Sequence, residues 1–464
     1  MSLSHSVAAL LLLSIAVAPG NSRADEVTNL RGELEALKSD YAARVQALEE
    51  RIAQLEAAAA SAASTPAPAE SPGMAAMAGP ASSAATAFNP AMSVILAGNY
   101  ANLSQDPATY AIAGFIPSGG EIGPGERSFN LGESELTLTA NVDPYFFANL
   151  TAAISPENEI GVEEAFFRTI ALPSGFTVKG GRFFSAFGYL NEVHAHAWDF
   201  TDQPLAYQAF FGGQLGQNGV QVKWVAPTDL FIELGAESGN GQEFPGTRRG
   251  RNGLNGATLF THVGNDIGDS ASWRAGVSYV DLRAEDRTWD DSDDAGLAVV
   301  DAFSGKSRTW VADAILKWAP QGNPTQRNLK VQGEYLRRTE DGDLAFDLDG
   351  LALRDAYRSR QSGWYVQSVY QFRPRWRAGV RYDSLDSGNS RIGLVDNGTL
   401  PPEAFASLLS ASPSRATLMV DWNPSEFSRL RAQFAWDDAR DAERDRQFQL
   451  QYLYSVGAHG AHKF

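Results

Sequence analysis

Two histidines separated by one residue are the side chains of this sequence best suited to bind a metal. His194 and His196 lie in the segment 182–213, and the carboxylates of Glu192 and Asp199 are close to them in the sequence. A His-x-His pair in a loop can supply two ligands to Zn²⁺, and a carboxylate can supply a third. The alternative is that the imidazoles pack among the aromatic residues of the segment. We therefore assign no metal and no cofactor, and keep His194 and His196 as candidate ligands.

Basic residues at alternate positions form the second pattern with possible chemistry, most clearly in 363–383. Successive side chains of a strand point to opposite faces, so one face of this segment is charged and the other is apolar and aromatic. The same charged parity in other segments completes a set of predicted pore-lining residues: Lys179, Lys223, Arg274, Lys317, Lys330, Arg375, Arg377, Arg381, Arg429 and Arg431. A basic wall favours the passage of anions. Cross-strand pairs with inward acidic residues, which would cancel these charges, are the alternative.

The alternating pattern recurs along the chain and predicts an all-β protein. We expect sixteen strands, at 91–103, 128–142, 144–155, 159–171, 175–187, 214–226, 229–239, 256–265, 270–284, 308–319, 327–339, 361–373, 375–386, 412–423, 427–437 and 446–457. Short connections, often with proline, follow the even strands. Long polar connections such as 240–255, 285–307 and 340–360 mostly follow the odd strands. This sorting is typical of outer-membrane barrels, and we predict a sixteen-stranded antiparallel transmembrane β-barrel over 88–464.

The residues before the barrel predict three further segments. Residues 1–24 have the apolar run of a signal peptide, with a cleavage site after Ala24. Residues 25–58 carry a heptad repeat with one stutter and predict a short α-helical coiled coil. Its core residues favour a dimer, whereas the barrel favours a homotrimer, and the pattern leaves both open. Residues 59–87 are rich in Ala, Ser and Pro and predict a linker.

The end of the chain predicts a cellular location. Aromatic and aliphatic residues alternate from Phe448 to Tyr454, and the chain ends in Phe464. This ending resembles the signal that bacterial outer-membrane proteins present to the barrel-assembly machinery. It implies a bacterial outer membrane with its lipid and lipopolysaccharide as partners, and places the coiled coil in the periplasm.

The segment 182–213 is too aromatic for a solvated loop, and we expect it to fold into the barrel and narrow the pore. Contact with another subunit is the alternative for the same residues. Its predicted members are Arg182, Glu192, His194, His196 and Asp199. The run Gly180–Phe184, followed by Phe187 and Gly188, resembles the strand-and-loop entry of the phosphate-selective porin family. That resemblance covers about 160–225 and implies a trimeric sixteen-stranded barrel with a constriction loop. The phosphate-binding rows of that family do not map onto this sequence, so phosphate selectivity is not implied.

Composition and motifs exclude several classes of function. With 38 basic and 55 acidic residues, the chain is not a general nucleic-acid binder. It contains no G-x-S-x-G, P-loop or H-E-x-x-H motif, so we expect no enzyme. The sequence therefore predicts an outer-membrane porin for passive diffusion of small hydrophilic solutes, with a preference for anions. A barrel that binds or takes up a metal ion or metal chelate is the alternative.

Overall fold

The computed structural model describes residues 90–119, 122–156, 159–248, 250–440 and 443–457. The predicted signal peptide, coiled coil and linker (1–24, 25–58 and 59–87) lie outside the described residues. The strands are β1 (Ala91–Leu103), β2 (Ser128–Leu131), β3 (Ser134–Asn141), β4 (Phe146–Ile154), β5 (Ile160–Thr169), β6 (Phe176–Phe184), β7 (Gly216–Val225), β8 (Phe231–Gly239), β9 (Gly256–Ile267), β10 (Ala271–Ser292), β11 (Ala298–Trp318), β12 (Asn328–Phe346), β13 (Leu353–Arg373), β14 (Trp376–Asp386), β15 (Arg391–Ile392), β16 (Ser414–Ser425), β17 (Ser428–Asp438) and β18 (Asp445–Gly457).

Helical segments in the described part of the chain are short. The α-helices are α2 (Leu205–Phe211) and α3 (Gly393–Asp396), and the 3₁₀ turns are η2 (Pro107–Thr109), η3 (Pro173–Gly175), η4 (Ala195–Ala197), η5 (Pro320–Gly322), η6 (Pro402–Ala404) and η7 (Ala406–Leu408). None of the helices within the described ranges is long and apolar enough to cross a membrane.

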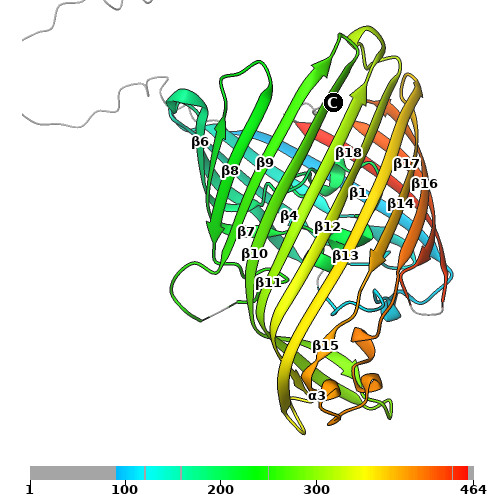
Figure 1. Cartoon of the computed structure of the whole chain (residues 1–464). Helices are drawn as coiled ribbons and strands as arrows, with labels where there is room; N and C mark the ends of the chain where they lie inside the picture. Colours follow the sequence, from blue (N-terminus) through cyan, green and yellow to red (C-terminus); the bar gives the residue numbers. More distant parts are fainter. Residues whose placement is uncertain (1–89, 120–121, 157–158, 249, 441–442, 458–464) are drawn as a thin grey trace, which may run out of the picture. The chain divides into compact units, whose positions relative to one another are not determined.

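Antiparallel pairing closes the strands into a barrel (Figure 1). β1 pairs with β3, where Val94 lies opposite Leu136, and with β18, where Ala97 lies opposite Leu453. The sheet has 18 strands, but β2 shares the position of β3 beside β1, and the two-residue β15 shares the position of β14 beside β13. Sixteen strand positions remain, which confirms the predicted barrel. Closure leaves no edge strand to be covered.

The predicted strand parity is confirmed by the exposure of neighbouring side chains. Val366 and Val380 are 48% and 52% exposed on the outer face, whereas Gln367 and Arg381 are 4% and 3% exposed on the inner face. Trp310 and Trp318 lie on the same outer face of β11. Their eight-residue separation is about 26 Å along a strand, comparable to the apolar band of about 25 Å on outer-membrane barrels.

The barrel wall is uneven in height. β10–β13, which we call the tall wall, have 19 to 22 residues each, whereas β3–β8, the low wall, have 8 to 10. Figure 1 shows the tall wall running beyond the other strands towards β15 and α3.

The tall wall corrects the prediction of long polar loops at 285–307 and 340–360, because strands occupy much of both segments. Many of their charged residues, such as Asp290, Asp341 and Arg358, are exposed, while Trp289, Phe303 and Tyr357 are buried in an apolar cluster with Phe405. The many charged residues of these segments led to the prediction of loops, although apolar residues alternate with them as in a strand.

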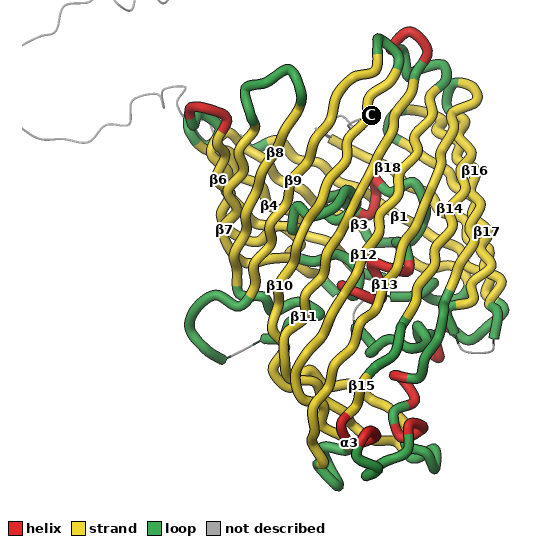
Figure 2. Tube along the Cα trace, in the orientation of Figure 1, coloured by secondary structure: helices red, strands yellow, loops and turns green. Residues whose placement is uncertain are grey.

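A long connection between β6 and β7 folds into the barrel, as expected for the predicted constriction loop. We call residues 185–215 the lumen loop; it contains η4 and α2, and all seven residues of α2 are buried. Figure 2 shows these short helices and loops within the ring of strands. Phe210 of α2 packs in one apolar cluster with Phe115 of the first long connection and with Leu336 and Tyr365 of the tall wall.

Candidate functional site

The lumen loop is fixed to the tall wall through a buried carboxylate. Glu334 on β12 accepts hydrogen bonds from the backbone N–H of Leu190 (3.0 Å) and from the hydroxyls of Tyr207 and Tyr365 (2.8 Å each). Burial and the Glu334 carboxylate raise the pKa of the Tyr207 hydroxyl well above its usual range. Tyr207 therefore stays neutral and donates. Together with the apolar cluster around Phe210, these bonds hold the loop against the tall wall.

Two aspartates of the lumen loop are each held between two basic residues of the wall. Asp199 pairs with Lys330 and with Arg377 (3.3 Å), and Asp202 pairs with Arg381 (2.9 Å) and Arg415 (2.6 Å). Burial alone would raise the pKa of both carboxyls, but these neighbouring cations outweigh it and lower both values below the usual range. Both aspartates are therefore charged at neutral pH.

Most of the predicted pore-lining basic residues have partners on the lumen loop or on neighbouring strands. Arg377 also pairs with Asp421, and Arg381 also pairs with Asp383 (3.0 Å). The remaining contacts are Lys179 with Glu192 (3.4 Å), Lys223 with Glu233 (3.2 Å), Arg274 with Asp313 (3.3 Å), Arg431 with Asp421 (2.8 Å), and Arg429 with the backbone carbonyls of His196 and Trp198 (3.2 Å each). Lys317 is partly buried on β11. The structure thus places these cations in ion pairs and hydrogen bonds that hold the loop and wall together.

Two predicted positions are wrong. Arg375 lies in the turn between β13 and β14, where it is exposed and has a φ of 69°, so it is not on the inner wall. The sequence pattern continued the parity of Arg377 through a turn, where strand alternation no longer holds. Arg182 lies on β6 and not on the lumen loop; its guanidinium donates to Asn218 and to the carbonyl of Val162 (2.8 Å each).

The two candidate metal-binding histidines meet a different set of carboxylates from the predicted one. Asp199 and Glu192 are paired with basic residues, as described above. His194 Nδ1 instead lies 3.1 Å from Glu163 and 3.4 Å from Glu135, and its Nε2 lies 3.1 Å from Glu164. His196 Nδ1 lies 2.7 Å from Glu135. We call these five residues the His–Glu cluster. Glu135 comes from β3, Glu163 and Glu164 come from β5, and both histidines come from the lumen loop.

The carboxylates of the His–Glu cluster determine the charge of His194. Burial by itself would lower the pKa of His194, but hydrogen bonds to the carboxylates of Glu135, Glu163 and Glu164 outweigh burial and raise the pKa well above its usual range. Without another cation, His194 is therefore an imidazolium at neutral pH, shared among three carboxylates.

A cavity of about 930 Å³ lies between the lumen loop and the low wall. Its lining comes from β1, β2, β4–β7 and β18, and from the first long connection, the turn after β4, the lumen loop and the connection after β8. The charged and titratable lining residues are Glu126, Glu133, Glu159, Glu163, Asp202, Glu243, Arg182 and His196. Carboxylates predominate in this set. The side of the lumen loop that faces the tall wall is packed, so the open space is found at the low wall.

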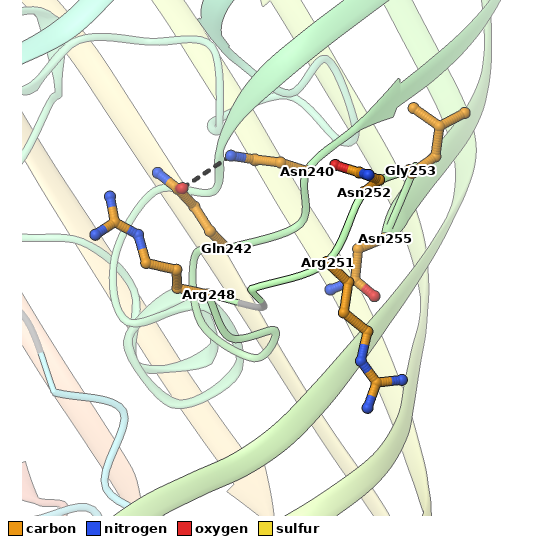
Figure 3. A pocket seen from close by; sticks show the side chains of 8 residues that line it. Asn240, Gln242, Arg248, Arg251, Asn252, Gly253 and Asn255 are labelled. Atoms are coloured by element: carbon orange, nitrogen blue, oxygen red, sulfur yellow. Dashed lines mark hydrogen bonds between the residues drawn. The ribbon is translucent and has the colours of Figure 1, made fainter.

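A second, much smaller pocket lies within the connection between β8 and β9 (Figure 3). Its volume of about 60 Å³ leaves room for only a few water molecules. Asn240 donates to Gln242 across it (2.8 Å), while Arg251 pairs with Glu285 (2.8 Å) outside it. This pocket is too small for an organic solute.

Sequence reasoning missed the residues that receive the lumen loop. Glu135, Glu334 and Asp383 are among the inward acidic residues that the strand pattern predicts, but the pattern assigns no role to the adjacent Glu163 and Glu164 or to the loop residue Asp202. Glu164 accepts a hydrogen bond from the backbone of Phe184 (3.2 Å), beside a register shift at Thr151 of the neighbouring strand. Two adjacent carboxylates in a strand of a membrane barrel are a usable signal, because strict alternation would send one of them into lipid.

Solved structures with a similar arrangement are outer-membrane proteins. A loop-deletion mutant of OmpT of Vibrio cholerae has a TM-score of 0.48 and 12% identity, covering 79% of this chain and 99% of that chain. An anion-selective porin from Comamonas acidovorans has a TM-score of 0.46 and 10% identity, covering 79% and 99%. The outer membrane channel DcaP of Acinetobacter baumannii has a TM-score of 0.45 and 13% identity, covering 79% and 96%. The barrel assignment rests on the strand pairing described above.

Sequence comparison provides the family. No family model matches the chain. An uncharacterized protein of Aquifex aeolicus is 32% identical over 359 residues, which cover 73% of this chain and 71% of that protein. At this identity and coverage, the chain belongs to the same protein family as the Aquifex aeolicus protein.

Proposed function

We propose that this protein is a porin-like channel of a bacterial outer membrane, through which small hydrophilic solutes diffuse passively. The observation that carries the proposal is the cavity of about 930 Å³ left between the lumen loop and the low wall of a closed barrel. The barrel satisfies its backbone groups by closure and presents an apolar outer face, as hydrocarbon requires. Its polar-lined space is the environment that a hydrated solute needs. No catalytic role is proposed.

The proposed orientation follows from the rims of the barrel. Ala91 at the start of β1 pairs with Thr139, close to the short turn after β3. Short turns face the periplasm in outer-membrane barrels, so we place this end of β1 there. The predicted coiled coil (25–58) and linker (59–87) would then form a periplasmic stalk after removal of 1–24. We also propose a homotrimer, the closed assembly that the phosphate-selective porin resemblance implies.

The charge around the cavity favours cations as the preferred ions. The basic rows that predicted an anion preference are largely neutralised by Asp199, Asp202 and the inward carboxylates of the wall. The cavity lining retains more carboxylates than cations, as noted above. A passage lined by one sign of charge concentrates ions of the opposite sign. No phosphate selectivity is proposed.

Reconstitution in planar bilayers tests both parts of the proposal. We expect steady single-channel conductance. Under a salt gradient, the sign of the reversal potential should show that cations permeate more readily than anions. The selectivity should weaken as salt rises, since the Debye length falls from about 10 Å at 0.1 M to about 3 Å at 1 M. A folded barrel that never conducts would refute the channel. A conducting barrel with anion selectivity at low salt would refute only the charge argument and restore the basic rows as the determinant.

A further inference from the structure

The His–Glu cluster has ligand atoms at the separations found around a bound metal ion. Carboxylate oxygens and imidazole nitrogens lie about 2.0–2.2 Å from Zn²⁺, and in a tetrahedron this places neighbouring ligand atoms about 3.3 Å apart. His194 Nδ1 lies 3.1 Å from Glu163 Oε2 and 3.4 Å from Glu135 Oε2. The three ligand atoms, one from each of these residues, all lie within 4.8 Å of one another. Three ligands of this kind leave a fourth position for water or solute.

Outer residues of the cluster orient two of the three ligands, His194 and Glu135, as they do in metal sites. A metal-binding histidine commonly donates its second ring N–H to a carboxylate, and ligating carboxylates are themselves hydrogen-bonded. Here His194 Nε2 faces Glu164 at 3.1 Å, and the second oxygen of Glu135 faces His196 Nδ1 at 2.7 Å. Glu164 is held in turn by the backbone N–H of Phe184 (3.2 Å). Both kinds of supporting contact are therefore present.

Two carboxylates compete for the single Nδ1 proton of the His194 imidazolium. His194 Nδ1 can carry one hydrogen, yet it faces carboxylates of both Glu135 and Glu163. Glu135 is only 2% exposed, so its charge needs close partners, of which His196 Nδ1 at 2.7 Å is one. A divalent cation placed between the three ligand atoms would be shared by both carboxylates and by the neutral imidazole.

We propose that Glu135, Glu163 and His194 bind a divalent first-row transition metal of the Zn²⁺ class, with Glu164 and His196 as positioning residues. The imidazole ligand disfavours Mg²⁺ and Ca²⁺, which prefer oxygen. Glu163 and His196 line the 930 Å³ cavity, so an ion can enter from it. Because the ligands come from β3, β5 and the lumen loop, the ion would fasten the loop to the low wall at the edge of the passage.

Zinc binding by the folded, full-length protein in detergent tests this assignment. We expect about one zinc per chain by elemental analysis after dialysis against limiting ZnCl₂, with tenfold or greater loss of affinity in Glu163→Gln and in His194→Gln. Glu164→Gln removes the charge of the supporting carboxylate and should lose about tenfold. An excess of CaCl₂ or MgCl₂ should not displace the zinc.

A second His–Glu pair in the barrel provides the matched control. Glu233 lies 3.0 Å from His262 Nδ1, but Lys223 lies 3.2 Å from it and already supplies a cation. Glu233→Gln should keep wild-type zinc affinity. Heat-dependent migration on gels and circular dichroism confirm folding of each variant. Absence of zinc from the wild type, or equal affinity in folded Glu163→Gln, His194→Gln and wild type, would overturn the site. Binding is measured without conductance, so this result is separate from that of the bilayer test.

Discussion

The lumen loop meets two walls of the same barrel in different ways. Towards the tall wall it buries α2 in an apolar cluster and donates to Glu334. Towards the low wall it presents His194 and His196 to three carboxylates, beside a cavity of about 930 Å³. Apolar packing excludes water, whereas charged groups need water or ions. The comparison indicates that the tall wall holds the loop in place and that the low wall borders the open cavity, where we propose the passage.

Removing the largest apolar contact on the tall-wall side should have the largest effect on stability. Phe210 is fully buried and packs against Phe115, with ring centroids 5.6 Å apart. We expect Phe210→Ala to lower the free energy of unfolding by about 3–5 kcal/mol, measured by denaturant titration in detergent. Phe129, which is 83% exposed, provides the control, because Phe129→Ala removes little buried area. Equal losses of unfolding free energy in the two variants would contradict the role of the apolar cluster around Phe210 in holding the loop.

Removing an ion pair that holds the lumen loop should reduce stability less than removing Phe210 from the apolar cluster. Asp202 pairs with Arg381 and Arg415, and both arginines keep other carboxylate partners. We expect Asp202→Asn to destabilise the fold by about 2–3 kcal/mol at neutral pH, and thermal unfolding checks this. Full wild-type stability in this variant would show that the ion pairs do not hold the loop.

Acid should remove the same contribution in the wild type. The pKa of Asp202 is lower in the folded protein than its ordinary value of 3.8. Its stabilisation is therefore complete above pH 3.8 and is lost as the pH falls through the lower, folded value. The difference in stability between wild type and Asp202→Asn should be constant from pH 5 to 7 and shrink below pH 4. A difference that shrinks already between pH 7 and 5 would contradict the lowered pKa.

Charge changes on the low-wall side should alter selectivity more than stability. Glu126 and Glu159 line the cavity and are exposed. A unit charge about 8 Å from the ion path in water contributes about 0.5 kcal/mol, favourable for cations and unfavourable for anions, and the Debye length of about 10 Å at 0.1 M salt roughly halves both effects. Each Gln substitution should therefore lower the cation-to-anion permeability ratio about twofold. Reversal potentials at 0.1 M salt measure this ratio. An unchanged ratio in the double variant would place the ion path elsewhere.

The smallest effect is expected from substituting a basic residue that lies in an exposed turn and not on the inner wall of the barrel. Arg375 lies in the exposed turn between β13 and β14. Arg375→Glu should change stability by less than about 0.5 kcal/mol and leave the reversal potential unaltered, as measured by the same two assays. A clear shift in reversal potential would bring this turn into the ion path and restore the position that the sequence pattern gave it.

The local pattern of the sequence determined the barrel strands and the direction of their side chains. The outward Val366 and Val380 and the inward Gln367 and Arg381 could be assigned from alternation, because the two faces of a strand are fixed by its backbone geometry. The aromatic character of 182–213 likewise predicted a loop inside the barrel, since so many apolar side chains need a packed environment.

Only the tertiary structure decided which residues meet across the lumen. Asp199 had been grouped with His194 because five positions separate them, yet it pairs with Lys330 and Arg377, while His194 meets Glu135 and Glu163. Those contacts join residues 31 to 178 positions apart. They depend on the path of the lumen loop through the barrel and on the unequal heights of its walls, which arise from packing among distant segments and not from any local pattern.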